Sequence, residues 1–291
     1  MGDMLRAISE DGFIRLTLID STDIVTIAQK YHNTTPVATA ALGRTLTMAA
    51  IMGCNLKSPD DRLTIYIKGD GPLGGIVAAA DGACNVKGYV YNPLTDIPKK
   101  ANGKLDVGGA IGKGYLSISR DLGLKDPYVG QVPLITGEIA EDFTYYYAKS
   151  EQTPTAVSLG VLVDTDLSAK KAGGFMIQLM PGCDDETAEK LEKHIATLPS
   201  ATELLSECET LKDAAFKILD GFSPKLLDEF AYFYRCDCSR DKIDRALISL
   251  GRKELEDIIN TEGKAELTCQ FCPKVYRLNK EELQNLLESA K

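Results

Sequence analysis

Four cysteines near the end of the chain form its most chemically capable pattern. Cys236 and Cys238 form a C-x-C pair, and Cys269 and Cys272 form a C-x-x-C pair thirty residues further on. Tetrahedral zinc takes four thiolates, and a C-x-x-C turn supplies two of them from one tight knuckle. We therefore predict one Zn²⁺ per chain, held by these four cysteines.

The module that carries these cysteines is small. It runs from about residue 232 to 291, a length at which a hydrophobic core alone is marginal. Structural zinc contributes roughly 10–16 kcal/mol to such modules, against about 5–15 kcal/mol for the stability of a whole domain. Loss of the metal should therefore unfold the module.

The same thiolates are open to oxidation. Cysteines two or three positions apart fall within disulfide range when their Cα atoms lie about 4.4–6.8 Å apart. Arg235, Arg240 and Lys274 lie close to the cysteines in sequence, where they favour the thiolate, which is the oxidisable form. Oxidation to disulfides would remove the zinc ligands, so the module would lose its metal and its main source of stability.

Other residues with chemical potential have simpler explanations. His32 and His194 are the chain's two histidines, and neither lies in a hydrolase signature. Cys54 and Cys84 are expected to be small core residues. Gly69 to Gly74 matches G-x-G-x-x-G, but Pro72 lies inside it and a strand-like segment follows, so we expect a hairpin turn and no dinucleotide site.

Composition narrows the class of protein. The net charge is −9 and the pI is near 4.9, which disfavours a nucleic-acid surface. The N-terminus lacks the apolar run of a signal peptide, and no stretch is long enough to span a membrane. We expect a cytoplasmic protein, in which thiols stay reduced and close cysteine pairs serve metal binding or redox control.

The fold class predicted from the elements is α+β. Segments 12–19, 62–68, 75–80 and 85–91 have the apolar alternation of strands, and Thr35-Pro36 starts an apolar helix to Cys54. Residues 1–181 are therefore expected to form a mainly antiparallel-sheet domain with packed helices. Three tyrosines at 145–147 cannot share one helix face, which is a weak hint of a contact surface.

Residues 182–231 are expected to form an acidic, all-helical connector. The segment Asp184 to Ala231 has twelve Asp and Glu against five Lys. Helices are predicted after Asp184, after the capping box Ser200 to Glu203, and from Ser223-Pro224 through Leu227, Phe230, Ala231 and Tyr234. Residues 232–291 then form a small zinc-binding α+β domain, with caps at Ser239 and Asn279 and two strands flanking the Cys269/Cys272 knuckle.

With these motifs in place, the whole chain resembles the 33-kDa heat-shock protein family of bacterial redox-regulated holdase chaperones. The resemblance lies in YRCDCS (234–239), TCQFC (268–272), PVATAALGR (36–44), KGYVYNP (87–93), YYAKSEQTPT (146–155) and GGFMIQLMPG (173–182). It implies a zinc-bound, inactive reduced state. It further implies that peroxide or hypochlorite forms Cys236–Cys238 and Cys269–Cys272 disulfides and releases the zinc.

The resemblance also implies how oxidation changes the protein. The connector unfolds, the protein tends to form a homodimer, and it holds unfolding client proteins without ATP or catalysis. Two alternatives remain open. One is a thiol–disulfide oxidoreductase using Cys269 and Cys272, and the other is a zinc-ribbon module that binds a partner constitutively.

Overall fold

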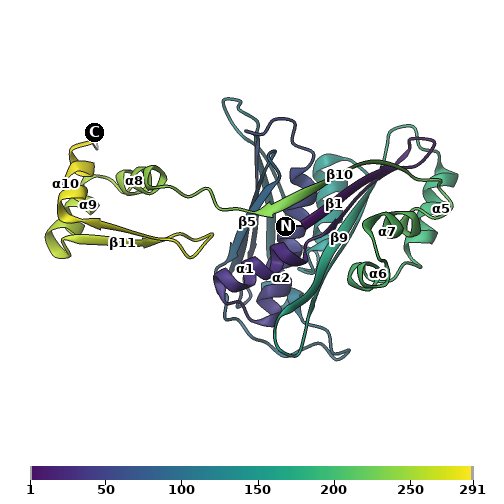
Figure 1. The fold of residues 1–291 in the computed structure, drawn as a ribbon, viewed down its shortest axis with the longest axis horizontal. Helices are drawn as coiled ribbons and strands as arrows, with labels where there is room; N and C mark the ends of the chain where they lie inside the picture. Colours follow the sequence, from purple (N-terminus) through teal and green to yellow (C-terminus); the bar gives the residue numbers. More distant parts are fainter. Residues whose placement is uncertain (1, 290–291) are drawn as a thin grey trace. The chain divides into compact units, whose positions relative to one another are not determined.

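The structure, a computed structural model, describes residues 2–289 and divides into two compact units between Arg235 and Cys236. The elements are labelled in Figure 1. The first unit contains β1 (Gly2–Ile8), β2 (Ile14–Asp20), α1 (Thr22–His32), α2 (Pro36–Gly53), β3 (Arg62–Gly69), β4 (Gly75–Asp81), β5 (Asn85–Val90), α3 (Val107–Ile111), β6 (Gly114–Asp121), β7 (Tyr128–Pro133), α4 (Ala140–Tyr146), the π-helix η1 (Tyr147–Glu151), β8 (Thr155–Val163), β9 (Ala169–Leu179), α5 (Asp185–Ile195), α6 (Ala201–Glu207), α7 (Leu211–Ile218) and β10 (Lys225–Tyr234). The second contains α8 (Arg240–Ser249), α9 (Arg252–Thr261), β11 (Lys264–Thr268), β12 (Val275–Asn279) and α10 (Lys280–Ser289).

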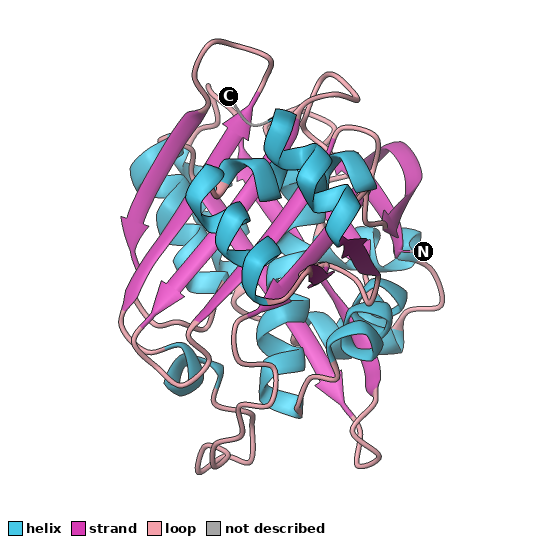
Figure 2. Ribbon diagram, turned by 90° about the vertical axis from the view of Figure 1, so that its left-hand side faces the viewer, coloured by secondary structure: helices cyan, strands magenta, loops and turns pink. Residues whose placement is uncertain are grey.

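The first unit is built on a ten-stranded sheet, whose strands run beside one another in Figure 2. The strand order is β7-β6-β3-β4-β5-β10-β1-β2-β9-β8. Every pairing in it is antiparallel except that of β10 with β5. The predicted α+β class with mainly antiparallel sheet is confirmed.

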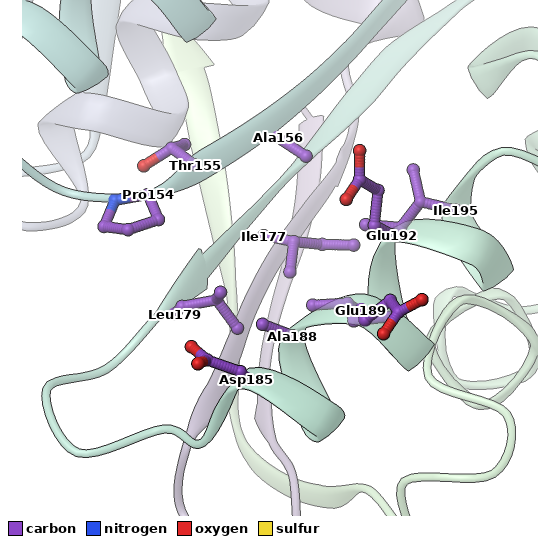
Figure 3. Close-up of a pocket in the computed structure, with 11 residues that line it drawn as sticks. Pro154, Thr155, Ala156, Ile177, Leu179, Asp185, Ala188, Glu189, Glu192 and Ile195 are labelled. Carbon is purple, nitrogen blue, oxygen red and sulfur yellow. The ribbon is translucent and has the colours of Figure 1, made fainter.

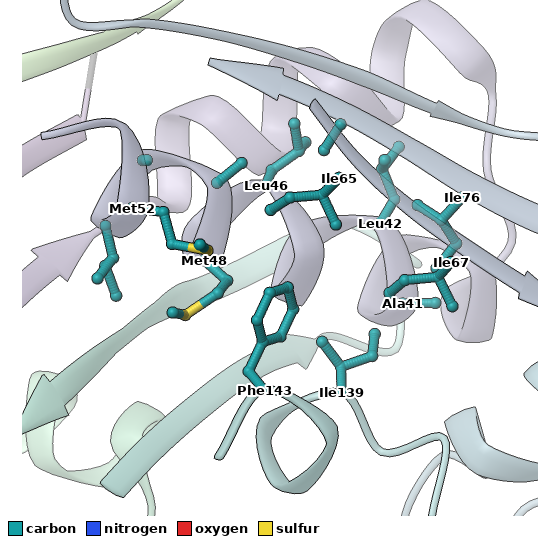
Figure 4. Packing of buried hydrophobic residues seen from close by; sticks show 14 of the residues in the cluster. Ala41, Leu42, Leu46, Met48, Met52, Ile65, Ile67, Ile76, Ile139 and Phe143 are labelled. Carbon is teal, nitrogen blue, oxygen red and sulfur yellow. The ribbon is translucent and has the colours of Figure 1, made fainter. Parts of the chain in front are cut away.

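Helix α2 forms the centre of the larger core. Thr35 precedes Pro36 at the first helical position, as predicted, and nearly every residue of the helix is buried. Figure 4 shows its Leu42, Leu46 and Met48 between the isoleucines of β3 and β4 and the side chains of Ile139 and Phe143. Each fully buried Leu or Ile contributes about 1.5–3 kcal/mol, so this helix anchors the unit.

Strand alternation sends side chains from the centre of the sheet into two different cores. In β1, Met4 packs with α2, whereas its neighbour Leu5 packs with the helices that follow β9. In β9, Met176 and Ile177 divide in the same way. Because these strands are buried on both faces, helices cover both sides of this part of the sheet.

Helices α5, α6 and α7 cover the second face, where they lie together in Figure 1. Asp184 caps α5, and Ser200 with Glu203 forms the capping box predicted for α6. The apolar side chains buried in this core are Leu5, Ala7, Ile14, Leu16, Leu18, Phe175, Ile177, Leu191, Leu204, Leu205, Ala214, Ala215, Ile218, Leu219 and Phe222. The predicted division into an N-terminal domain (1–181), a linker (182–231) and a C-terminal domain (232–291) remains a prediction.

The prediction of a third connector helix starting at Ser223-Pro224 is wrong. Residues 225–234 form strand β10, which pairs along its length with β1 and at Phe233 and Tyr234 with β5. The spacing of Leu227, Phe230 and Ala231 imitates a helix. Phe230, Tyr232 and Tyr234 instead alternate onto one face of a strand and pack against the α2 core. The all-helical description holds for 185–218 and fails for 225–231.

Two smaller expectations are resolved by the first unit. Strands β3 and β4 pair antiparallel across the glycine-rich turn, with Gly74 at φ 77°, so the hairpin interpretation is confirmed. Of the three consecutive tyrosines, Tyr146 and Tyr147 are buried in the core and Tyr145 is half-buried. They therefore act mainly as packing residues.

The second unit has a small core of its own. Its fully buried apolar side chains are Leu247, Leu255, Ile259, Leu278 and Leu283. Asn279 and Glu282 exchange hydrogen bonds of 2.8 and 2.9 Å, as predicted for the cap of the last helix. Strands β11 and β12 form a two-stranded hairpin. A core of this size leaves the unit dependent on further stabilisation.

Candidate metal centre

The four predicted ligands come together in the second unit. Cys236 and Cys238 precede α8, while Cys269 and Cys272 lie in the turn between β11 and β12. The Cys236 and Cys269 sulfurs are 3.6 Å apart, as are those of Cys238 and Cys272, and all four lie within 4.8 Å of one another. The four cysteines are therefore positioned to hold one metal ion.

The spacing of the sulfurs fits zinc. Zn–S bonds of about 2.3 Å in a tetrahedron place sulfur atoms about 3.8 Å apart. The 3.6 Å contacts match that edge, and the 4.8 Å limit leaves every sulfur within reach of one centre. An all-sulfur donor set selects a soft or borderline ion such as Zn²⁺ over Mg²⁺ or Ca²⁺.

Local structure fixes the two cysteine pairs. The Cys269 N–H donates to the Lys274 carbonyl at 2.9 Å, which closes the knuckle next to the Thr268–Val275 strand pair. On the other side, the Ser239 hydroxyl caps α8 by accepting from the Lys242 N–H. Each pair is thus attached to a regular element within one or two residues.

The thiols are not equivalent. Burial, with contact from the Cys238 and Cys269 sulfurs, raises the pKa of Cys236. Burial likewise raises the pKa of Cys272. Burial alone would also raise the pKa of Cys238, but interactions with Tyr276 and the other three cysteines bring it below the ordinary value. The sulfurs therefore do not share one environment, and a metal must displace the proton of each one that is still a thiol when it binds.

Charged groups around the cluster only partly follow the sequence expectation. Arg240 is engaged by Asp244 at 2.8 Å and Glu282 at 2.9 Å. Lys274 instead faces the cluster: its ammonium lies 4.9 Å from the Tyr276 ring centre, and Tyr276 together with Cys238 and Cys272 raises its pKa. Of the three cations named from the sequence, Lys274 is one whose charge interacts with the cluster sulfurs Cys238 and Cys272.

Sequence reasoning did not single out Tyr276. It lies on β12 opposite Leu267 and is 7% exposed. Its hydroxyl is buried without a hydrogen-bond partner of good geometry, and the nearby Cys238 sulfur raises its pKa. The sequence signal was only an aromatic residue four positions after Cys272, which does not by itself indicate a neighbour of the cluster.

The remaining cysteines and both histidines lie outside the cluster. Burial raises the pKa of Cys54 to about 12, as befits a core thiol. Cys84 is half-buried against the same core. The His32 ring nitrogen bonds to the Tyr234 hydroxyl, and burial lowers the pKa of His32. The His194 ring nitrogen lies 3.1 Å from the Ile218 carbonyl.

A groove of about 580 Å³ runs between α5 and the ends of β8 and β9 (Figure 3). Its floor includes Ala156, Ile177 and Leu179, and Glu189 and Glu192 stand on its helical side. Its lining includes no cysteine, histidine or serine. Among the helices of residues 2–289, none is long and apolar enough to cross a membrane.

Comparisons with known proteins agree with one another. The profile of the Hsp33 protein family matches residues 2–279. A 33 kDa chaperonin of Clostridium perfringens (strain SM101 / Type A) is 49% identical over 287 residues, covering 98% of this chain and 91% of the relative. One of Clostridium beijerinckii is 46% identical over 289 residues, covering 99% of each. The crystal structure of the 33 kDa chaperonin (heat shock protein 33 homolog) of Thermotoga maritima has a TM-score of 0.91 at 41% identity, covering 99% of this chain and 98% of that one.

Proposed function

Because the chain belongs to the Hsp33 family and so has a chaperone role, we propose that it is an ATP-independent holdase switched by oxidation. The observation that carries the redox part is the cluster of four sulfurs within 4.8 Å of one another. Its relatives are named as chaperonins, which supports a chaperone role without catalytic chemistry on clients. The cysteine switch is a control device and turns over no substrate.

In the resting state, Cys236, Cys238, Cys269 and Cys272 hold one Zn²⁺. The bound ion would link the two cysteine pairs to each other, and its positive charge would keep all four sulfurs as thiolates. The residues around them give support: the Cys269–Lys274 hydrogen bond holds the knuckle, and Ser239 fixes α8 next to Cys238. The small apolar core of the unit makes this cross-linking its main source of stability.

Activation is the oxidation of the ligands. Two thiolates, one hydrogen peroxide and two protons give one disulfide and two waters, so the four cysteines consume two peroxides. We assign the disulfides to Cys236–Cys238 and Cys269–Cys272. Disulfide sulfurs are poor ligands, so the ion is released together with its contribution to folding.

Strand β10 connects this event to the rest of the chain. Arg235 alone separates its last residue, Tyr234, from Cys236. The pairing of β10 with β5 covers only Phe233 and Tyr234, extended by the Arg235 N–H to the Val86 carbonyl at 3.0 Å. Unfolding that begins at Cys236 therefore meets a short parallel pairing first, beyond which lies the longer pairing with β1.

The segment released in this proposal is residues 182–231. Its helices carry narrow apolar faces, such as Leu204, Ala215 and Ile218, while their other faces are acidic. Release would expose those faces and the sheet surface beneath them, and exposed apolar surface binds other proteins. We also propose that the oxidised form makes a homodimer. We further propose that the protein is located in the cytoplasm, where the thiols of its resting state stay reduced.

The test compares reduced and oxidised protein. Peroxide should release about one zinc per chain, lower the helix content and confer suppression of aggregation of a thermally unfolding client. Oxidised protein that has lost zinc yet leaves client aggregation unchanged would sink the proposal. Catalytic turnover in an insulin-reduction assay would instead support a thiol–disulfide oxidoreductase. If the reduced, zinc-bound protein bound the client as tightly as the oxidised protein does, the result would support a zinc-ribbon module that binds its partner constitutively.

A further inference from the structure

A second pocket, of about 500 Å³, lies in the first unit where helix α2 ends. Its walls come from the last turn of α2 and the loop after it, from β2, β6 and β9, and from the π-helix η1. We call it the arginine pocket, because Arg15 of β2 and Arg120 of β6 both line it. Small-molecule sites have volumes of about 300–1,000 Å³, so the pocket is of a size to hold one.

The strand pattern explains why an arginine lies here. Along β2, Leu16 and Leu18 pack beneath α5, α6 and α7, whereas Ile19 packs in the α2 core. Alternation therefore places Arg15 on the α2 side of the sheet, near the start of the strand. Its side chain is half-buried. The fold thus carries a guanidinium at the edge of its larger core.

Arg15 lacks a partner of opposite charge. Within residues 2–289, the structure shows no ion pair of this residue. One Nη donates to the Gln178 side-chain oxygen at 2.5 Å, across the strand pair of β2 with β9, and Nε is buried without a hydrogen-bond partner. Taking a charge out of water without a counter-charge costs free energy. An anion bound in the pocket would supply that counter-charge.

The negative groups around the pocket are engaged elsewhere. Asp61 accepts from two backbone N–H groups of its own loop at 3.0 and 3.1 Å. Glu151 accepts from Arg120 at 2.9 Å and from the Tyr146 hydroxyl at 2.7 Å. The carbonyls of residues 50–53, at the end of α2, each accept a hydrogen bond from the residues that follow. None of these groups serves as the counter-charge of the β2 guanidinium.

The charge of the lining fits one negative group. Three cations, Arg15, Arg120 and Lys57, stand against two carboxylates, Asp61 and Glu151, so the lining has a net charge of +1 in a chain of net charge −9. A single carboxylate balances this charge, and its two oxygens match the planar fork of a guanidinium. A phosphate monoester, at about −1.5 to −2, would bring excess negative charge beside the two carboxylates.

The rest of the lining is largely apolar. It includes Met52 of α2, Tyr147 of η1, and Leu122 and Met180 from the loops after β6 and β9. Leu122 is 45% exposed, so an apolar side chain already faces solvent at the pocket. A π-helix such as η1 is rare and frequently marks a functional site. The pocket therefore combines a cation with a surface that favours an apolar body.

We propose that the arginine pocket binds a small monocarboxylate with an apolar body. The carboxylate pairs with the Arg15 guanidinium, and the apolar body packs against Met52, Leu122 and Tyr147. The site goes beyond the proposed function and does not rest on it. It belongs to the first unit, its lining includes none of the four cluster cysteines, and its ligand is a small molecule and no client protein.

The probe is phenylbutyrate, compared with phenylbutanol and phenylbutylamine. The three have the same apolar body and differ in carrying a negative charge, no charge or a positive charge. Titration calorimetry with the full-length, reduced and zinc-loaded protein measures the affinity. Because the guanidinium lacks a counter-charge, phenylbutyrate should bind at least tenfold more tightly than the alcohol, and the amine should bind more weakly than both.

Methionine methyl groups report where the probe binds. Met52 and Met180 line the arginine pocket, whereas Met4 is buried in the α2 core and is not part of the lining. In the NMR spectrum of protein with isotope-labelled methionine methyl groups, phenylbutyrate should shift the Met52 and Met180 signals and leave the Met4 signal in place.

A first pair of variants tests the cation. Arg15→Met keeps a long apolar side chain without the guanidinium and should weaken phenylbutyrate binding at least tenfold. Arg245→Met makes the same change of charge at an exposed arginine of the second unit and should stay within twofold of the wild type.

A second pair needs no change in the core. Leu122→Asp adds a carboxylate to the lining and should weaken phenylbutyrate binding at least tenfold, because it repels the carboxylate of the probe. Leu124→Asp changes the net charge equally at a position 72% exposed that is not part of the lining, and should bind within twofold of the wild type. If Arg15→Met does not fold, this pair decides.

Three results would each overturn the inference: phenylbutyrate binding no more tightly than phenylbutanol, a test variant binding like its control, or unmoved Met52 and Met180 signals at saturation. Failure of the holdase function has a different signature. It is a loss of protection against client aggregation by oxidised protein, measured with no carboxylate probe present.

Discussion

The four sulfurs of the metal centre differ in the groups that act on them. The backbone N–H of Cys238 stabilises the thiolate of Cys236, and the backbone N–H of Lys274 stabilises that of Cys272. Tyr276 stabilises the thiolate of Cys238. Hydrogen bonds to thiolates orient metal ligands and tune their reactivity. The residues next to the cysteines therefore tune how tightly a metal is held.

Replacing one ligand tests the donor set. Cys236→Ser should lower zinc affinity by more than about 100-fold, since loss of a mere outer-shell partner already costs about 10–100-fold. Competition with a chromophoric chelator measures the affinity. Cys183→Ser, at a half-buried cysteine outside the cluster, should bind zinc as the wild type does. Unchanged affinity in Cys236→Ser would remove Cys236 from the ligand set.

At the scale of elements, β10 is the key strand, because it is the last element of the first unit before the chain enters the second. It occupies the middle of the sheet between β5 and β1. Tyr232 on this strand is fully buried, and its hydroxyl donates to the Asp81 carbonyl at 3.2 Å. Arg6 of β1 binds Asp228 of β10 through its Nε at 2.7 Å. The strand thus has both apolar and polar attachment to the first unit.

Neighbouring residues of β10 provide a matched pair of variants. Tyr232→Ala should destabilise the first unit by about 3–5 kcal/mol, the usual cost of removing a buried aromatic ring. Phe233→Ala, at a position 44% exposed on the same strand, should cost less than about 1 kcal/mol. Urea unfolding followed by fluorescence measures both. Equal effects would mean that residue 232 is not anchored in the folded sheet.

Glu138 joins three segments and makes stability depend on pH. It bonds to Lys100, to Arg44 of α2 at 2.8 Å and to the Gly108 N–H. Burial alone would raise the pKa of Glu138, but Lys100 and Arg44 hold it below its ordinary value. A carboxyl with a lowered folded-state pKa stabilises the fold above its unfolded-state pKa, and this stability is lost as pH falls through the folded-state pKa.

Glu138→Gln should therefore cost about 1–3 kcal/mol at pH 7. The difference from wild type should shrink below about pH 4.5 and disappear at lower pH, where the wild-type carboxyl is protonated too. Urea midpoints between pH 3 and 7 test this. Glu189→Gln removes an exposed helical ion pair with Lys193 and should stay near wild type throughout. A pH-independent cost at Glu138 would contradict the assignment.

What the sequence could predict was local. The cysteine spacing, the Thr35-Pro36 helix start and the caps at Ser200 and Asn279 each depend on a few adjacent residues, and all are found in the structure. The identity of β10 depends on partners in β1 and β5, which no local pattern contains. The same holds for the outer face of β6, β3, β4 and β5, because only the register of these strands brings Tyr66, Tyr89 and Tyr115 onto one surface.

At the scale of the whole molecule, the two units differ in how they are stabilised. The first has extensive cores on both sides of its central strands, whereas the described part of the second has one small cluster of buried side chains, formed by Leu247, Leu255, Ile259, Leu278 and Leu283. In the proposed function the second unit depends on a metal and the core around α2 does not, so the two are expected to respond to different conditions.

Chelation of the metal from reduced protein should separate these responses. Amide protection in residues 240–289 should fall, because zinc contributes roughly 10–16 kcal/mol to a site of this kind. Protection in β3 and β4 should remain, because their buried side chains belong to the α2 core, which includes none of the four cluster cysteines. Hydrogen exchange followed by mass spectrometry resolves the two regions. Unchanged protection in residues 240–289 after complete metal removal would contradict this account.

The central place of β10 also dictates when the sheet can close during synthesis. Its partner β1 is made first, more than two hundred residues earlier, and β5 waits through about 140 residues. Until residue 234 has left the ribosome, both strands present unpaired edges, which attract other chains. Contacts so distant in sequence also form slowly. The nascent chain thus passes through a stage in which it shares the hazard of the proteins it is made to protect.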